Sequence, residues 1–220
     1  MTLLGCLFLV LHQSYAQLPP EEAVQKATKH QPSGYGIKLG YNIAKLTGST
    51  PSFSPDAKGG FHVSAFYAPS SKGMGYRTEL VFSRQSFAFD EDGTMQNVQQ
   101  DYVFMPHLTT FTIAKILQLQ AGGQIGYLLN AKKEADSKNS SEDITEFMNR
   151  LDYGAALGVE IYPFKGLILG ARYNVSVRNP YKEIMDGNTS PTPQPFPLPV
   201  NPNDFKGKNA VVQISAGYRF

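Results

Sequence analysis

The chain has 220 residues, of which 41% are hydrophobic and 17% charged, and its mean hydropathy is −0.27. These values exclude a helical membrane protein, and they do not suggest disorder. The formal charge of only +2, without a basic stripe, argues against nucleic acid as a partner. Because Cys6 is the only cysteine, neither a disulfide framework nor a thiolate metal site is available.

The first residues have the pattern of an export signal. An apolar run ends in the small-residue pattern Ser14-Tyr15-Ala16, which predicts a signal peptide over residues 1–16. The run lacks a basic start and is too short to span a membrane as a helix. The letters LLGC imitate a lipoprotein cleavage site, but the apolar run continues past the cysteine, which disfavours lipidation. Residues 17–33 are polar and are predicted to form a periplasmic lead-in to a single domain over residues 34–220.

From Tyr35 onward the sequence alternates with a period of two residues, which is typical of β-strands. Eight strands are predicted, over residues 35–46, 60–68, 75–89, 101–112, 117–130, 151–162, 167–178 and 211–220. In most of them one parity is apolar and the other is rich in Gly, Gln, Asn and Ser. The second strand is apolar on both parities, so its facing stays open. In the fourth strand the apolar parity holds Tyr102, Phe104, Pro106 and Leu108, and the polar parity holds Asp101, Val103, Met105 and His107.

The connections between these strands alternate in length. Those over residues 69–74, 113–116 and 163–166 are short. The others are longer and cover residues 47–58, 90–97, 131–149 and 179–209. A transmembrane β-barrel has short periplasmic turns and longer outside loops, whereas a soluble sandwich has no reason to segregate them in this way.

The alternation itself fits two opposite orientations. In a soluble lipocalin-like barrel the apolar parity would form the core, and in an outer-membrane barrel it would face lipid. The polar parity has few of the charges that decorate a solvated surface, and those present are nearly balanced, so they can pair inside a narrow lumen. This predicts an eight-stranded antiparallel transmembrane β-barrel of up-and-down topology. Its predicted polar network in the lumen comprises Lys38, Arg77, Glu79, Asp101, Asp152, Glu160, Arg172, Arg178 and Arg219.

The segments GYGIKLGYNIAKLTG, TELVFSRQSF, DYVFMPHL, LDYGAALGVEIYPFKGLILGARYN and the terminal AGYRF resemble the eight-stranded outer-membrane barrel family common in Bacteroidota, which includes the PorT-like proteins. The resemblance covers roughly residues 35–220 and implies location in the outer membrane of a Gram-negative bacterium. It also implies that Tyr218 and Phe220 form a C-terminal insertion signal read by the barrel assembly machinery. Since the family pattern includes a proline at Pro106, a β-bulge is expected there.

The sequence contains no pattern typical of catalysis. His107 has Asp101 on its own strand, but too far away to orient it, and no His, Asp or Glu cluster has metal spacing. No catalytic residue, cofactor or metal is therefore predicted. The segment DEDG at residues 90–93 lacks the later ligands of a calcium loop and is interpreted as a turn.

The last long connection has a stiff, proline-rich composition. Pro191, Pro193, Pro195, Pro197 and Pro199 recur at every second position and favour an extended arm that either covers the barrel mouth or docks another envelope protein or a surface glycan. Arg84 is predicted to contact a lipopolysaccharide phosphate, or otherwise to be solvated, near the outer rim.

An eight-stranded barrel is just wide enough to be filled by side chains, so free diffusion of solutes is not expected. The sequence therefore favours a non-enzymatic protein that acts through its extracellular loops, or as an accessory to an envelope or secretion complex. A lipid-modifying barrel enzyme and a small-solute channel remain as alternatives. The expected partners are outer-membrane lipid and lipopolysaccharide, the assembly machinery and an envelope protein.

Overall fold

The computed structural model describes residues 34–47, 55–71, 73–91, 93–113, 116–135, 141–182, 198 and 207–220. The predicted signal peptide, the lead-in and the five prolines of the arm lie outside the described residues. Among the described residues, no helix is long and apolar enough to cross a membrane. The elements are β1 (Gly34–Thr47), β2 (Asp56–Ala68), β3 (Met74–Glu91), β4 (Thr94–Ile113), β5 (Leu117–Ala135), β6 (Ser141–Asp143), the 3-10 helix η1 (Thr145–Phe147), β7 (Leu151–Ile161), β8 (Leu167–Ser176) and β9 (Lys208–Arg219).

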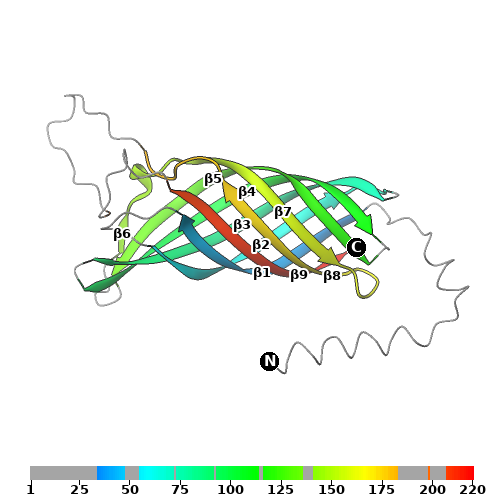
Figure 1. The fold of residues 1–220 in the computed structure, drawn as a ribbon, viewed down its shortest axis with the longest axis horizontal. Coiled ribbons are helices and arrows are strands. Elements are labelled where there is room, and N and C mark those ends of the chain that lie inside the picture. The colour runs from blue at the N-terminus through cyan, green and yellow to red at the C-terminus, as the bar shows by residue number, and fades with distance from the viewer. Residues whose placement is uncertain are drawn as a thin grey trace, which may run out of the picture. The chain divides into compact units, whose positions relative to one another are not determined.

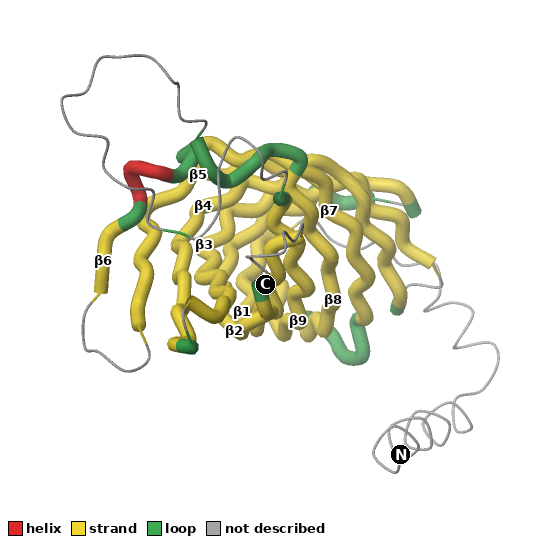
Figure 2. Tube along the Cα trace, turned by 60° about the vertical axis from the view of Figure 1, so that its left-hand side comes forward, coloured by secondary structure: helices red, strands yellow, loops and turns green. Residues whose placement is uncertain are grey.

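The strands form one closed antiparallel sheet (Figure 1). Each strand of the ring pairs with its neighbours in the chain, with β5 followed directly by β7, and the pairing of β1 with β9 closes the circle. Eight strands therefore make the barrel, as the alternation predicted. The remaining strand, β6, lies outside the ring and pairs only with the end of β5 (Figure 2).

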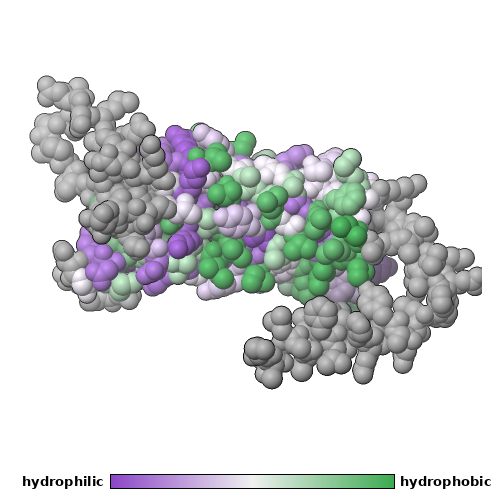
Figure 3. All heavy atoms as spheres, in the orientation of Figure 1, coloured by the Kyte–Doolittle hydropathy of each residue, from purple (hydrophilic) through white to green (hydrophobic). Residues whose placement is uncertain are grey.

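The apolar parity of the strands lies on the outside of the barrel. In β1, Leu39 is 62% exposed whereas Lys38 next to it is only 4% exposed. The same holds for Ile125 of β5 and Ile214 of β9, which are exposed although their neighbours in the chain turn inward. In Figure 3 the hydrophobic residues on the visible face gather over the middle of the barrel and toward the end that carries the C-terminus. A soluble barrel would bury these side chains, so the exposed belt requires lipid around it.

The two ends of the barrel differ. One end carries the C-terminus and the short connections, and there the Phe220 amide donates to the Tyr35 carbonyl oxygen at 2.9 Å. Phe220 is 72% exposed and thus completes the outer, lipid-facing surface of β9. The other end carries β6, η1 and the longer connections. We refer to these as the periplasmic end and the outer end.

The structure settles the facing of β2 and corrects that of β4. In β2, His62, Ser64 and Phe66 turn inward. In β4 the prediction was wrong, because Tyr102, Phe104, Pro106 and Leu108 face the lumen, whereas Met105 and His107 face outward. The error arose because the inner face of β4 is apolar even beside the charged layer, where Leu108 pairs with Arg77 of β3, so polarity does not mark the facing of this strand.

Pro106 does not create the expected bulge. Pairing between β3 and β4 keeps the same register on both sides of the proline and is only interrupted next to it, since proline has no N–H to donate. The register shifts lie elsewhere, between Asp101 and Tyr102 in the pairing with β5 and between Lys58 and His62 in the pairing of β2 with β3.

The connection predicted over residues 90–97 is mostly strand. Glu91 pairs with Thr94, so β3 and β4 are joined by a two-residue turn in which Gly93 has a φ of +75°. The Gly93 amide donates to Asp90 Oδ1 at 2.9 Å. The interpretation of DEDG as a turn is thus confirmed, but the long loop is replaced by long strands that extend past the lipid-facing belt.

Above the belt, the polarity of the sheet inverts. Most outward-facing residues of the strand extensions are polar, with Ala88 and Met95 as exceptions. The polar ones are Arg84, Ser86 and Asp90 of β3, Asn97, Gln99 and Asp101 of β4, and Asn130, Lys132 and Glu134 of β5. The inward-facing residues at the same level include the apolar Phe87, Phe89, Val98 and Ala131, with Gln85, Gln96 and Gln100 among them. This is the pattern of a sheet surrounded by water, so the outer part of β3, β4 and β5 projects out of the membrane.

Candidate functional site in the barrel lumen

A buried network of charges fills the periplasmic half of the lumen. Glu79 of β3 and Arg172 of β8 form a two-pronged ion pair, with Nη2–Oε1 at 2.7 Å and Nη1–Oε2 at 2.8 Å. Lys38 of β1 donates to Glu79 Oε1 at 2.6 Å. All three side chains are at most 8% exposed. The pairs therefore connect walls of the barrel that are distant in sequence.

Glu160 of β7 is the second carboxylate of this network. Its oxygens accept two bonds from Arg77 Nη1, at 2.7 and 2.6 Å, and one from Lys38 Nζ at 3.1 Å. Tyr162 donates its hydroxyl hydrogen within the same group, and its oxygen lies 2.8 Å from Glu160 Oε2 and 2.9 Å from Gln118 Oε1. Each charged group thus has several partners, which is what keeps a buried ion pair from being costly.

The aromatic ring of Phe66 lies close to three cations of this network. The Arg77 guanidinium carbon lies 4.4 Å from the centre of the Phe66 ring, and Lys38 and Arg219 are each 5.7 Å from it. A ring face carries partial negative charge, so this aromatic side chain offsets part of the cationic excess. A Cβ at Gly36 would collide with the same ring, which explains a glycine at this inward position.

A neutral polar layer lies beside the charged one. Asn42 donates to Ser83 Oγ at 2.9 Å and to the backbone carbonyls of Phe61 and Arg84 at 3.0 and 2.9 Å. His62 Nδ1 lies 2.7 Å from Asn42 Oδ1, which also accepts from Gln213 at 3.1 Å. These amides and hydroxyls connect β1, β2, β3 and β9 by hydrogen bonds.

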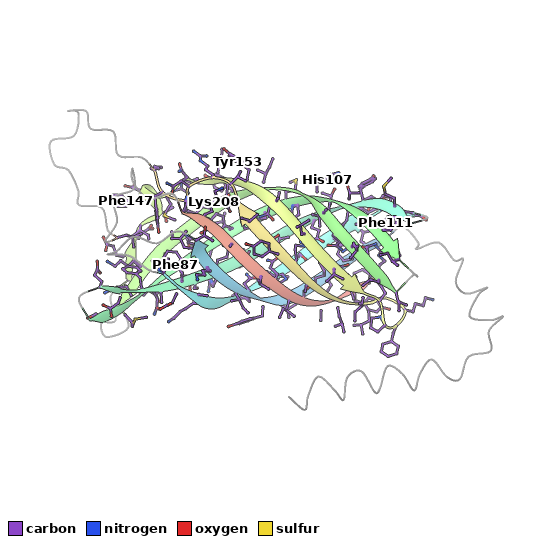
Figure 4. The ribbon with its side chains drawn as sticks, in the orientation of Figure 1. Phe87, His107, Phe111, Phe147, Tyr153 and Lys208 are labelled. Carbon is purple, nitrogen blue, oxygen red and sulfur yellow. The ribbon has the colours of Figure 1, made fainter. Side chains whose placement is uncertain are left out.

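The outer half of the lumen contains an apolar cluster that continues into the connections. It comprises Leu46, Val81, Phe87, Phe89, Val98, Tyr102, Phe104, Leu128, Ala131, Ile144, Met148, Tyr181 and Leu198, with Phe147 packed against it. Figure 4 shows Phe87 and Phe147 at the outer end. Leu198, flanked by two of the arm's prolines, is 4% exposed, so this position of the arm is anchored in the cluster.

Hydrogen bonds hold the outer connections over this cluster. Asn149 donates from its amide side chain to the carbonyls of Asn179 and Tyr181, at 2.9 and 2.8 Å. The Ala131 amide donates to Thr145 Oγ1 at 2.8 Å, which ties η1 to β5. The Thr145 amide donates to Asp143 Oδ1, and the hydrogen bonds from Thr145 hold the pKa of that exposed carboxyl below its usual value.

Six of the nine predicted network residues lie in or against the charged layer: Lys38, Arg77, Glu79, Glu160, Arg172 and Arg219. Asp152 is buried higher up and accepts from Ser176 Oγ at 2.6 Å. Arg178 lies at the outer rim and donates to Asn149 Oδ1 at 3.0 Å.

The prediction that Asp101 belongs to the lumen network was wrong. It lies on the outer face, where it bonds Arg84 Nε and Nη2 at 2.7 and 2.9 Å, because the facing of β4 is opposite to the predicted one. The predicted network also lacked Tyr162, Gln118 and Phe66. The sequence placed Gln118 on the inward, polar parity, but it did not show that Gln118 contacts Arg77 and Tyr162 of other strands.

The cavities left inside are very small. Among the described residues, one cavity of about 10 Å³ is lined by Lys38, His62 and Arg172, and another of the same size by Phe104, Asn174 and Asn209. This is about the space that one water molecule needs. No group of three or more His, Cys, Asp or Glu side chains in the described part of the chain could hold a metal ion.

A closed ring of eight antiparallel strands with an apolar outside and a charged, filled inside defines a transmembrane β-barrel. The chain belongs to the family described as outer membrane protein beta-barrel domain, which matches residues 15–181. It is therefore a protein of the outer membrane. A comparison with curated proteins gives no significant sequence match.

Several solved outer-membrane proteins are similar in fold. Ail, the attachment invasion locus protein of Yersinia pestis, in complex with the heparin analogue sucrose octasulfate, is 17% identical, with 86% of this chain and 100% of that chain covered and a TM-score of 0.46. Neisserial surface protein A is 11% identical, with 86% and 98% covered and a TM-score of 0.50. OprG from Pseudomonas aeruginosa is 11% identical, with 88% and 98% covered and a TM-score of 0.44. At such identities the likeness concerns the fold alone.

Proposed function

We propose that this barrel is a non-enzymatic protein that acts through its extracellular part, or as an accessory to an envelope or secretion complex, and not as a channel. The observation that carries the proposal is the filled lumen. The ion pairs around Glu79 and Glu160 occupy one half, the apolar cluster occupies the other, and the cavities described above, among the residues that the structure describes, are water-sized. A hydrated solute has no path through such an interior.

The part that projects from the membrane supports a binding role. The outer ends of β3, β4 and β5, together with β6 and η1, form a sheet with its own apolar cluster on one side and polar side chains on the other. Backbone pairing runs to the tips, up to Glu91 with Thr94 and Glu134 with Ser141. A rigid surface of this kind loses little conformational entropy when a partner binds.

An enzymatic role has less support. Ser176 and Asp152 are hydrogen-bonded near the outer end, but His62 is enclosed in the lumen and His107 faces outward, so neither histidine joins them. The assignment to the PorT-like proteins of Bacteroidota belongs to the same proposal and is supported by the segments that resemble that family.

Planar-bilayer recordings test the proposal. The purified barrel, added at the concentration at which a general porin gives clear current steps, should give none. A second experiment concerns the Pro-rich arm. Its five alternating prolines are replaced by serine while Leu198 is kept. If the barrel acts through this arm, an envelope protein captured by the parent chain should be lost. Stable current steps from the parent chain would show that the lumen conducts and would contradict the proposal.

A further inference from the structure

The charged layer of the lumen holds more positive than negative charge. Its interlocked cations are Lys38, Arg77 and Arg172, and the carboxylates between them are Glu79 and Glu160. Three positive and two negative groups leave an excess of one positive charge, and all five residues are at most 8% exposed. A buried charge without a counterion is costly, so the layer needs one further negative charge.

The third buried carboxylate that faces the lumen, among the described residues, is too far away to supply this charge. It belongs to Asp152 of β7. The register aligns Arg172 with Gly158 of the same strand, and the six residues from Gly158 to Asp152 span about 20 Å. Arg219 is a further cation, and a proton on His62 would only add positive charge. The excess in the layer is therefore at least one unit.

A small cavity borders this excess charge. It has a volume of about 10 Å³, and Lys38, Ser64 and Arg172 lie on its wall together with Glu79 and Glu160. The space is about that of one water-sized sphere. It admits one monatomic ion or one water molecule, whereas a polyatomic anion such as sulfate or phosphate is too large for it.

Ser64 and Lys38 offer hydrogen-bond donors to this cavity. The register places Ser64 of β2 directly opposite Lys38 of β1, and both side chains face inward. Ser64 is 3% exposed, and its hydroxyl has no hydrogen-bond partner among the described residues. Within the same part of the chain, Lys38 donates to Glu79 and Glu160, which uses two of the three N–H bonds of its ammonium group. A hydroxyl and an ammonium side by side are suited to an anion.

We propose that this cavity binds one chloride ion, held by the Ser64 hydroxyl and the Lys38 ammonium beside the Arg172 guanidinium. The ion brings the charged layer to three positive and three negative charges. The carboxylates of Glu79 and Glu160 do not oppose it, because their oxygens already accept from the cations at 2.6 to 3.1 Å. The ion is a structural counterion, and this inference is independent of the function proposed above.

The choice of salt tests the proposal. The barrel is refolded into vesicles and then unfolded with urea, in sodium chloride and in sodium gluconate at equal ionic strength. Since chloride binds the folded barrel and not the unfolded chain, saturating chloride should lower the unfolding equilibrium constant tenfold or more, and bromide should replace it. Equal unfolding constants in chloride and gluconate would overturn the proposal.

Crystals grown in bromide test the position of the ion. An anomalous signal is expected in the cavity between Ser64 and Lys38. A water molecule at this place, without any bromide signal, would show that the layer keeps its excess charge and would overturn the proposal.

Variants at Ser64 test the sign of the charge that the cavity accepts. Ser64→Asp brings its own carboxylate, so it should be at least as stable as Ser64→Asn, which has the same shape, and it should lose the response to chloride. Ser83→Ala is the control, because Ser83 is buried and bonds Asn42 but is not among the residues that line the cavity, so the response should persist. If Ser64→Asp is less stable than Ser64→Asn, or still responds to chloride, the cavity does not hold an anion.

Discussion

Arg172 of β8 and Glu79 of β3 face each other across the lumen and bond through the two terminal guanidinium nitrogens, at 2.7 and 2.8 Å. Around the ring, four steps separate the two strands, so the pair joins opposite walls. Lys38 and Arg77 lie against the same carboxylate, at 2.6 and 3.6 Å. The ion pairs therefore link opposite walls of the barrel as a cross-brace, and the first prediction below follows from this link.

Removing one carboxylate of this group should destabilise the barrel strongly. Glu79→Gln leaves three buried cations around Glu160 alone, and we expect a loss of about 3–5 kcal/mol in the free energy of unfolding. Urea titration in lipid vesicles, followed by gel mobility, measures it. Glu91→Gln is the control, since Glu91 is 31% exposed in its pair with Lys133 and should contribute about 0–1 kcal/mol. Adding Lys38→Met to Glu79→Gln should recover part of the loss, and equal effects of the two Glu→Gln changes would contradict the cross-brace.

Two adjacent leucines should respond very differently. Leu128 is fully buried in the outer apolar cluster, whereas Leu129 next to it is 43% exposed. Leu128→Ala should cost about 2–5 kcal/mol because it leaves a cavity. Leu129→Ala should cost about 0.5 kcal/mol or less, as surface changes usually do. The same unfolding titration compares them, and similar costs would show that the outer half has no packed core.

A charge on the outside should be penalised according to depth. Ile214 is 56% exposed within the lipid-facing belt, and Ile214→Arg should cost about 2–4 kcal/mol. Val177 faces outward at the outer rim, directly after β8, and Val177→Arg should cost only about 0–1 kcal/mol. Refolding yields in vesicles of defined thickness measure the difference. Equal penalties at the two sites would contradict the placement of the belt.

The predicted lipid contact of Arg84 can be tested through its partner. Asp101 occupies Nε and Nη2 of the guanidinium, which leaves Nη1 for an outside phosphate, and the Arg84 side chain is 37% exposed. Arg84→Ala should reduce the lipopolysaccharide that co-purifies with the barrel, whereas Asp101→Asn should keep or raise it. If neither change alters the amount, Arg84 does not bind this lipid.

Most of the barrel could be predicted because alternation is reliable where the wall separates lipid from a polar lumen. Strands such as β1 and β8, with Lys38 or Arg172 on the inner parity and Leu39 or Leu169 on the outer one, show the contrast directly. The strand count, the antiparallel order and the closing role of the last strand followed from it and are confirmed by the pairing.

The rest could not be predicted because the contrast reverses above the membrane. In β4 the inner face stays apolar from Tyr102 to Leu108, also at the level of the belt, while Asp101 points outward, so polarity along this strand gives the opposite facing. The cross-strand bonds of Tyr162 and Gln118 were missed for another reason. They depend on which walls come together in space, which a periodic pattern within one strand does not contain.

The position of the charges in the lumen also affects how the barrel closes. Lys38 lies on β1, the first strand, and Arg172 on β8, the last strand but one, and both form ion pairs with Glu79 of β3. Until the two sheet margins meet, Arg172 cannot reach Glu79 and Lys38 cannot reach Glu160, so a half-wound intermediate lacks the ion pairs that cross the lumen. The ion pairs across the lumen therefore stabilise the seam between β1 and β9. This favours insertion as one concerted event and makes later separation of these two strands slow.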